Sequence, residues 1–193
     1  MKYDLVEIFE SLQGEGRNSG RPCVFVRFAG CNLACPWCDT DVRRRFSMNL
    51  AELVTEVSGF RARSVILTGG EPTLVKGVPE LIAALKEKGF WIAVETNGTI
   101  AADWLAFVDY VACSPKRGAA LELRTANEVR VVAEDARTAE FCREVRTRVT
   151  ADDYYVSPCD HDGQIDFATA KDVLGQLDGW SLSVQLHKLL GFR

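Results

Sequence analysis

Short runs of apolar residues recur along the chain, separated by segments in which apolar positions follow a helical period. The runs are nearly continuous, which is typical of strands buried on both faces of a parallel sheet. The predicted strands cover residues 24–28, 65–67, 92–95, 110–113, 129–133, 154–157 and 182–185.

Between these strands, apolar residues repeat every three or four positions, as on one face of an amphipathic helix. Leu50, Leu53 and Val57 mark the first helix, and Asn49 with Glu52 is able to form a capping box at its start. The other helices are expected before Gly89 and over residues of about 136–149 and 167–177. This alternation predicts one α/β domain over residues 1–193, with a mostly parallel sheet that is open or partly closed into a barrel.

Each of five predicted strands leads directly into small or polar residues. These segments are residues 30–32, 68–72, 95–98, 113–116 and 185–188. Because loops at the carboxyl ends of parallel strands meet at one edge of the sheet, the pattern predicts an active site there.

Composition excludes several classes of protein. Lys and Arg number 23 against 27 Asp and Glu, a net charge of −4, which argues against a nucleic-acid or membrane-surface binder. No apolar run is long enough to span a bilayer, and Lys2, Asp4, Glu7 and Glu10 interrupt the place of a signal peptide. We therefore expect a cytoplasmic protein.

Three of the seven cysteines form the pattern C-x3-C-x2-C: Cys31, Cys35 and Cys38. Thiolates this close on one loop are able to hold a single iron–sulfur cluster, and three ligands leave one iron of a 4Fe–4S cluster open. A structural zinc site is the alternative, with Cys23 or a distant histidine as fourth ligand. The remaining thiols, Cys23, Cys113, Cys142 and Cys159, are expected to be small core residues.

The cysteine pattern, with Trp37 before its last cysteine, resembles the radical S-adenosylmethionine (SAM) superfamily, and Gly69-Gly70-Glu71-Pro72 resembles its GGE motif. The resemblance implies a 4Fe–4S cluster whose open iron binds SAM, the source of a 5′-deoxyadenosyl radical. It implies that Glu71 receives the methionine amino group. The cofactor contacts it implies are Trp37, Asp39, Gly70, Glu71, Ser114, Pro115, Lys116 and Gln185.

Further segments, residues 10–16, 25–27, 38–40, 114–116 and 182–188, are similar to the 7-carboxy-7-deazaguanine synthase family. This resemblance implies a partial TIM-type barrel with few helices, a homodimer, and a lyase that contracts 6-carboxy-5,6,7,8-tetrahydropterin with loss of ammonia. It implies a Mg²⁺ ligand at Thr40. The substrate contacts it implies are Leu12, Gln13, Gly14, Glu15, Arg27, Thr68 and His187.

Other interpretations stay open at this point. Arg27 suits a substrate carboxylate but also a salt bridge at the sheet. The basic run Arg43-Arg44-Arg45 is either a solvated face or a docking site for a flavodoxin- or ferredoxin-type reductant. The alternative functions are a glycyl-radical-enzyme activase and a metal-stabilised binding module.

Overall fold

The structure is a computed structural model that describes residues 1–38, 40–161 and 163–192. Its strands form one sheet in the order β10-β8-β7-β6-β5-β4-β2-β1-β3, and β9 pairs with β8. The strands are β1 (Lys2–Leu12), β2 (Pro22–Phe28), β3 (Phe46–Asn49), β4 (Ser64–Gly69), β5 (Trp91–Thr96), β6 (Tyr110–Cys113), β7 (Thr125–Ala133), β8 (Thr150–His161), β9 (Gln164–Asp166) and β10 (Ser181–Leu182). Neighbouring strands from β2 to β10 are parallel, whereas β1 is antiparallel to both β2 and β3.

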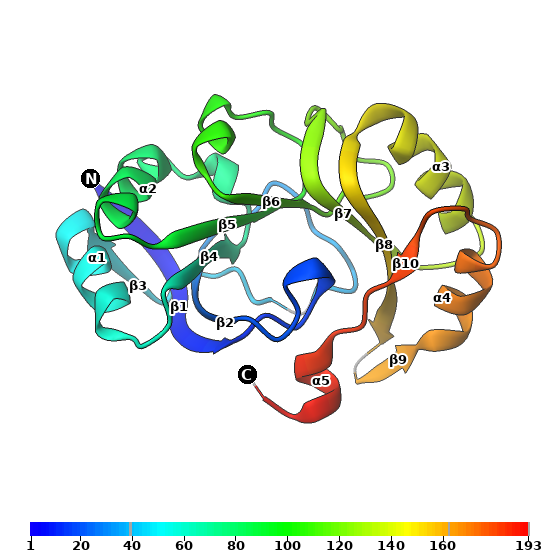
Figure 1. The fold of residues 1–193 in the computed structure, drawn as a ribbon, viewed down its shortest axis with the longest axis horizontal. Coiled ribbons are helices and arrows are strands. Elements are labelled where there is room, and N and C mark those ends of the chain that lie inside the picture. Colours follow the sequence, from blue (N-terminus) through cyan, green and yellow to red (C-terminus); the bar gives the residue numbers. More distant parts are fainter. Residues whose placement is uncertain (39, 162, 193) are drawn as a thin grey trace.

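The sheet curves without closing, and its helices gather at the two ends (Figure 1). The α-helices are α1 (Leu50–Gly59), α2 (Val78–Glu87), α3 (Thr138–Arg148), α4 (Phe167–Leu174) and α5 (Leu186–Leu190), and the 3-10 turns are η1 (Gly16–Asn18), η2 (Pro72–Leu74) and η3 (Asp103–Phe107). The middle of the sheet, β5 to β7, is connected by η3 and loops. The predicted partial barrel with few helices is therefore confirmed.

Helix α1 begins where the sequence predicts. The Asn49 side chain accepts a hydrogen bond from the Glu52 amide at 3.0 Å, and the Glu52 carboxylate accepts one from the Asn49 amide at 2.7 Å. This reciprocal cap satisfies two of the backbone donors that a helix start leaves without partners. The buried face of α1, including Leu53 and Val57, belongs to the main core.

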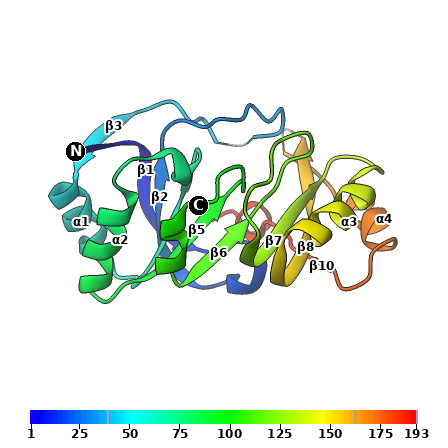
Figure 2. The same cartoon turned by 90° about the horizontal axis from the view of Figure 1, so that it is seen from above.

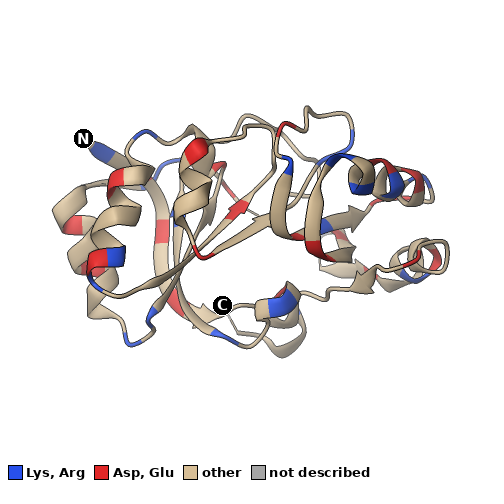
Figure 3. Ribbon diagram, turned by 45° about the horizontal axis from the view of Figure 1, so that its top comes forward, with Lys and Arg blue, Asp and Glu red and all other residues tan. Residues whose placement is uncertain are grey.

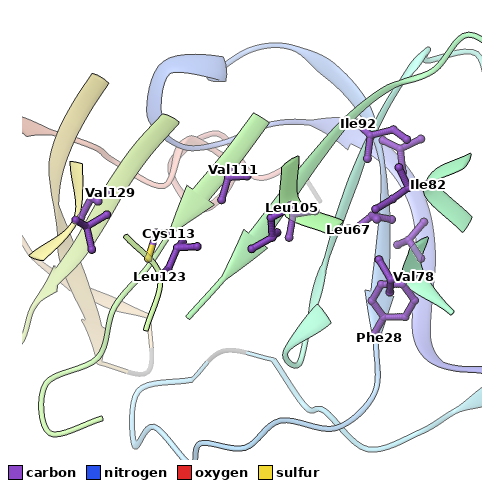
Figure 4. Packing of buried hydrophobic residues seen from close by; sticks show 14 of the residues in the cluster. Phe28, Leu67, Val78, Ile82, Ile92, Leu105, Val111, Cys113, Leu123 and Val129 are labelled. Atoms are coloured by element: carbon purple, nitrogen blue, oxygen red, sulfur yellow. The ribbon is translucent and has the colours of Figure 1, made fainter. Parts of the chain in front are cut away.

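The main core lies between the outer face of the sheet and the helices. Phe28, Leu67 and Ile92 project from three adjacent strands toward Val78 and Ile82 of α2 (Figure 4). Alternate residues on the same strands face the inside of the curved sheet, where Phe25, Ile66, Ala93 and Ala112 form a smaller cluster. One face of the sheet is therefore fully committed to the core, and the other is free to build a site.

Two elements differ from the hydrophobic pattern. The pattern does not predict β1, because a register shift between Leu5 and Glu7 interrupts the alternation that Tyr3 and Leu5 begin. The strand expected at 182–185 is too long: β10 ends at Leu182, and the chain then turns into α5.

The segment that joins β2 to β3 crosses the carboxyl edge of the sheet (Figure 2). Charges of both signs are intermixed on α3 and α4, and acidic positions also occur on the central strands (Figure 3). Within the described ranges, no helix is both long and apolar enough to cross a membrane.

Candidate active site

A cavity of about 250 Å³ opens at the carboxyl edge of the parallel strands. It is lined by side chains that continue the inner face two positions beyond the apolar cluster: Arg27 after Phe25, Thr68 after Ile66, and Glu95 after Ala93. Because the strands are parallel and in register, these polar residues lie in one layer. The inner face is thus apolar at one end and polar at the end where the cysteine loop crosses it.

All three cysteines of the motif line this cavity. The Leu33 amide donates to the Cys31 sulfur at 3.5 Å, and the Cys38 amide donates to the Cys35 carbonyl at 3.1 Å. Burial raises the pKa of the Cys35 thiol, and the nearby charge of Lys116 acts in the opposite direction. The loop therefore presents its sulfurs to the cavity.

In the described part of the chain, no three His, Cys, Asp or Glu side chains are grouped so as to hold a single metal ion. A structural zinc site needs four ligands around one ion. Three thiolates of a 4Fe–4S cluster bind three different irons and are spread around a larger body. The arrangement thus fits a cluster and does not fit the zinc alternative.

The Gly-Gly-Glu segment after β4 lies against the start of the cysteine loop. Gly70 donates to the Phe28 carbonyl at 2.9 Å, and Glu71 donates to the Gly30 carbonyl at 3.0 Å. A β-carbon on Gly70 would lie 1.7 Å from the Gly30 carbonyl oxygen, so only glycine permits this approach. The motif glycines thereby fix the position of the loop that carries Cys31.

The Glu71 carboxylate is almost fully buried and accepts four hydrogen bonds. The donors are the amide and hydroxyl of Thr73, the hydroxyl of Thr96 and the amide of Asn97, at 2.7 to 3.0 Å. Glu71 therefore ties the loops after β4 and β5 together. Its expected contact with a methionine amino group stays a prediction.

Lys116 lies at the opposite wall, after β6. Its ammonium donates to the carbonyl and hydroxyl of Ser114 at 2.5 and 2.7 Å and lies 5.2 Å from the centre of the Trp37 ring. Burial lowers the pKa of Lys116, and the nearby thiols Cys35 and Cys113 oppose that shift. Lys116 and Trp37 therefore join the cysteine loop to the end of β6.

Arg27 makes both of the contacts that sequence reasoning weighed separately. Its Nη1 donates to the Thr40 hydroxyl at 3.1 Å, and its Nε lies 2.9 Å from a Glu7 carboxylate oxygen. The side chain still lines the cavity and is about one quarter exposed, at 26%. The salt bridge is present, and it leaves the guanidinium at the wall of the site.

The segment after β1 and the C-terminal segment close the remaining side. The Leu186 amide donates to the Gly14 carbonyl at 3.0 Å, and the Gly16 amide donates to the Ser183 hydroxyl at 2.9 Å. A β-carbon on Gly14 would meet the His187 ring at 2.3 Å. The Gln13 amide group bonds Glu95 at 3.0 Å and the Glu15 backbone at 3.1 Å, so it orients its neighbours.

Most of the predicted site residues line this one cavity. They are Leu12, Gln13, Gly14, Glu15, Arg27, Cys31, Cys35, Trp37, Cys38, Thr40, Thr68, Gly70, Glu71, Ser114, Lys116, Gln185 and His187. Pro115 is buried and is not part of the lining, and Asp39 lies outside the described residues. The individual roles of these residues remain predictions.

Sequence reasoning missed Glu95 and Arg130 as site residues. Glu95 accepts from Thr68, Gln13 and Arg130; burial alone would raise its pKa, but these partners hold the pKa at about 2. Arg130 lies within an otherwise apolar strand, β7, and its side chain is 6% exposed. A charged residue inside such a strand is the signal that was available in the sequence.

Comparison with known proteins gives consistent relatives. Residues 25–149 match the family model of the radical SAM superfamily. The chain is 42% identical to a 7-carboxy-7-deazaguanine synthase of Haemophilus influenzae, over 98% of this chain and 93% of that one. It is 40% identical to one of Bacteroides thetaiotaomicron over the full length of both.

Among solved structures, QueE from Escherichia coli superposes with a TM-score of 0.78 at 28% identity, covering 97% of this chain and 95% of that one. SuiB from Streptococcus suis superposes with a TM-score of 0.54 at 12% identity, over 81% of this chain and 47% of that one, and shows likeness of fold alone. The relatives therefore favour the synthase over an activase.

Proposed function

The chain belongs to the radical SAM superfamily and, within it, to the 7-carboxy-7-deazaguanine synthase family; from this we propose that it contracts 6-carboxy-5,6,7,8-tetrahydropterin to 7-carboxy-7-deazaguanine with loss of ammonia, a carbon–nitrogen lyase reaction. The observation that carries the proposal is the shared cavity. Three cysteines, a guanidinium and a pair of carboxylates line the same 250 Å³ space.

Cys31, Cys35 and Cys38 would hold the 4Fe–4S cluster, with SAM at its open iron between Gly70, Trp37 and Lys116. Together the reduced cluster and SAM supply a carbon-centred radical that takes hydrogen from the substrate. The chain's own residues hold the loop: Gly70 permits its close approach, and Asn97 donates to Asn32 at 3.0 Å beside the Cys31 sulfur.

The substrate has two chemically different ends. Its carboxylate suits Arg27, with Mg²⁺ bound at the Thr40 hydroxyl and completed by substrate and water oxygens. Its pyrimidine edge carries N–H donors, which suit the carboxylates of Glu15 and Glu95 on the other side of the cavity. Holding the ring at both ends restricts it to one orientation, which is a large part of catalysis in a rearrangement.

The setting of the enzyme follows from its chemistry. All seven cysteines are unpaired, which supports a reducing compartment, the cytoplasm. We expect a homodimer and a flavodoxin- or ferredoxin-type reductant. Arg43 and Arg45 are paired with Asp41, and Arg44 lies near Asp4, so these ion pairs support the solvated-face interpretation of the basic run.

The test is reconstitution. The protein is loaded with iron and sulfide anaerobically and given dithionite, SAM, Mg²⁺ and 6-carboxytetrahydropterin, and products are identified by mass spectrometry. The proposal expects 7-carboxy-7-deazaguanine that depends on both SAM and the cluster. Protein with verified iron–sulfur content that cleaves SAM but forms no such product would overturn it.

A further inference from the structure

One guanidinium, that of Arg130 on β7, holds three carboxylates at the floor of the cavity. Its Nη1 contacts Glu15, its Nη2 lies 2.7 Å from Glu95, and its Nε lies 2.9 Å from Glu128. These acids come from the segment after β1, from the end of β5 and from β7 itself. The planar guanidinium is suited to this task, because its donors diverge in fixed directions.

The three carboxylates do not have the same surroundings. Glu128 is 2% exposed and lies behind the cavity, where it accepts from the Tyr110 hydroxyl at 2.8 Å and the Arg17 amide at 3.0 Å. Glu15 and Glu95 line the cavity itself, and Arg130 lies between them. Two of the acids are therefore available to a ligand, and the third anchors the arginine.

Arg130 leaves the group with an excess of negative charge, three carboxylates to one cation. Burying charges without partners is costly, so an edge that offers N–H donors is the ligand that complements this floor. An anionic group is repelled from it and is left to Arg27 at the other wall. The charge distribution thus assigns the two ends of a ligand to two walls.

We infer that Arg130 is a positioning residue: it holds Glu15 and Glu95 as a pair of oriented acceptors, and so gives the cavity floor its preference for the amino-pyrimidine edge of the substrate. The inference rests on the proposed function and adds to it the residue that prepares the recognition surface. A role in folding alone would make no difference to how binding depends on pH.

The acid range separates the two roles. Arg130 counteracts the burial that would raise the pKa of Glu95, and the pKa stays at about 2. Without Arg130, burial and the neighbouring carboxylates favour the protonated form, which has lost acceptor capacity. The other ionisable groups around the cluster are Arg17, Tyr110, Lys116, Asp153 and Tyr155.

The experiment measures binding of 6-carboxypterin, an unreactive oxidised analogue, to the reconstituted enzyme with SAM and Mg²⁺ between about pH 5.5 and 7.5. The variants are R130M, R130K and the double variant E128Q/R130M, which removes one unmatched charge if R130M fails to fold. R137Q is the matched control, since Arg137 pairs with Asp135 on the surface and is 77% exposed.

We expect R130M and E128Q/R130M to bind about 10- to 100-fold more weakly, the loss of hydrogen bonds to charged groups. Their affinity should fall further as the pH decreases, while the wild type, R137Q and R130K share one pH profile. Variants at position 130 that keep the wild-type pH profile would overturn the inference while leaving the proposed function intact. Absence of pterin binding by the wild type would overturn both.

Discussion

Arg27 and Thr40, on β2 and beyond the third motif cysteine, are joined by a 3.1 Å hydrogen bond from Nη1 to the hydroxyl oxygen. The proposed magnesium ligand therefore lies beside a permanent positive charge, which Glu7 balances from the other side at 2.9 Å. A divalent cation placed there is repelled by the guanidinium unless an anion lies between them.

We therefore predict that Mg²⁺ binding depends on the substrate carboxylate. Affinity should be about tenfold higher with 6-carboxypterin than without it, a coupling of ordinary size for two ligands in one site. Titration with Mn²⁺ followed by electron paramagnetic resonance measures the difference. Pterin lacking the carboxylate is the control, and tight metal binding without any ligand would contradict the prediction.

Replacement of Cys35 by alanine should prevent cluster assembly, because two thiolates remain where three are needed. Bound iron and sulfide and the release of 5′-deoxyadenosine are the measurements, and both should be lost. Cys142→Ala is the matched control: Cys142 is fully buried in the core beneath α3, and burial raises its pKa to about 12. It should keep its cluster, and retention of SAM cleavage by the Cys35 variant would exclude the assignment.

Gly70→Ala should displace the cysteine loop. The new methyl group would lie 1.7 Å from the Gly30 carbonyl oxygen, and neither backbone is able to yield without moving the other. We expect at least about 2 kcal/mol of destabilisation, measured by chemical unfolding, and loss of cluster loading. Gly59→Ala, which has no atom within 4 Å of the added carbon, should stay within about 0.5 kcal/mol of the wild type. Equal effects of the two changes would contradict this reading.

Glu71→Gln should destabilise the protein by about 1–3 kcal/mol, because one oxygen that accepts buried hydrogen bonds becomes a donor facing other donors. Thermal unfolding of the apoprotein measures this without any cofactor. Glu56→Gln, an exposed position on α1, is the control and should change little. An unaltered unfolding temperature for the Glu71 variant would show that the loops are held by other means.

The ion pair between Lys188 and Asp160, 2.7 Å, should make the C-terminal segment sensitive to acid. The hydrogen bond from Lys188 lowers the pKa of Asp160 in the folded state. Its stabilising contribution is therefore present above the ordinary pKa of an aspartate and is lost as the pH falls through the lower folded value. Amide hydrogen exchange of the α5 segment should speed up on acidification, and Asp160→Asn should already exchange fast at neutral pH. Equal exchange in the variant and the wild type at neutral pH would refute the tether.

The sequence predicts the parallel strands well because residues such as Ile66 and Val94 are buried on both faces of the sheet, where nearly every position is apolar. Strand β1 escapes the pattern because a bulge changes its buried face after Leu5. The cysteine loop and the Gly-Gly-Glu turn are local in sequence, so spacing identifies them. Arg130 and Glu128 are not, since their partners lie 35 or more positions away or are reached only when the sheet forms.

The side of the cavity that lacks barrel strands is covered by the stretch containing Ser183, Leu186 and His187, bonded to the segment after β1. Figure 1 places the C-terminal end beside α5 and the N-terminal end at the far side of the sheet. For work in the laboratory, this makes the two ends unequal. An affinity tag fused before Met1 stays clear of the chemistry, whereas one fused after the last residue sits at the mouth of the site.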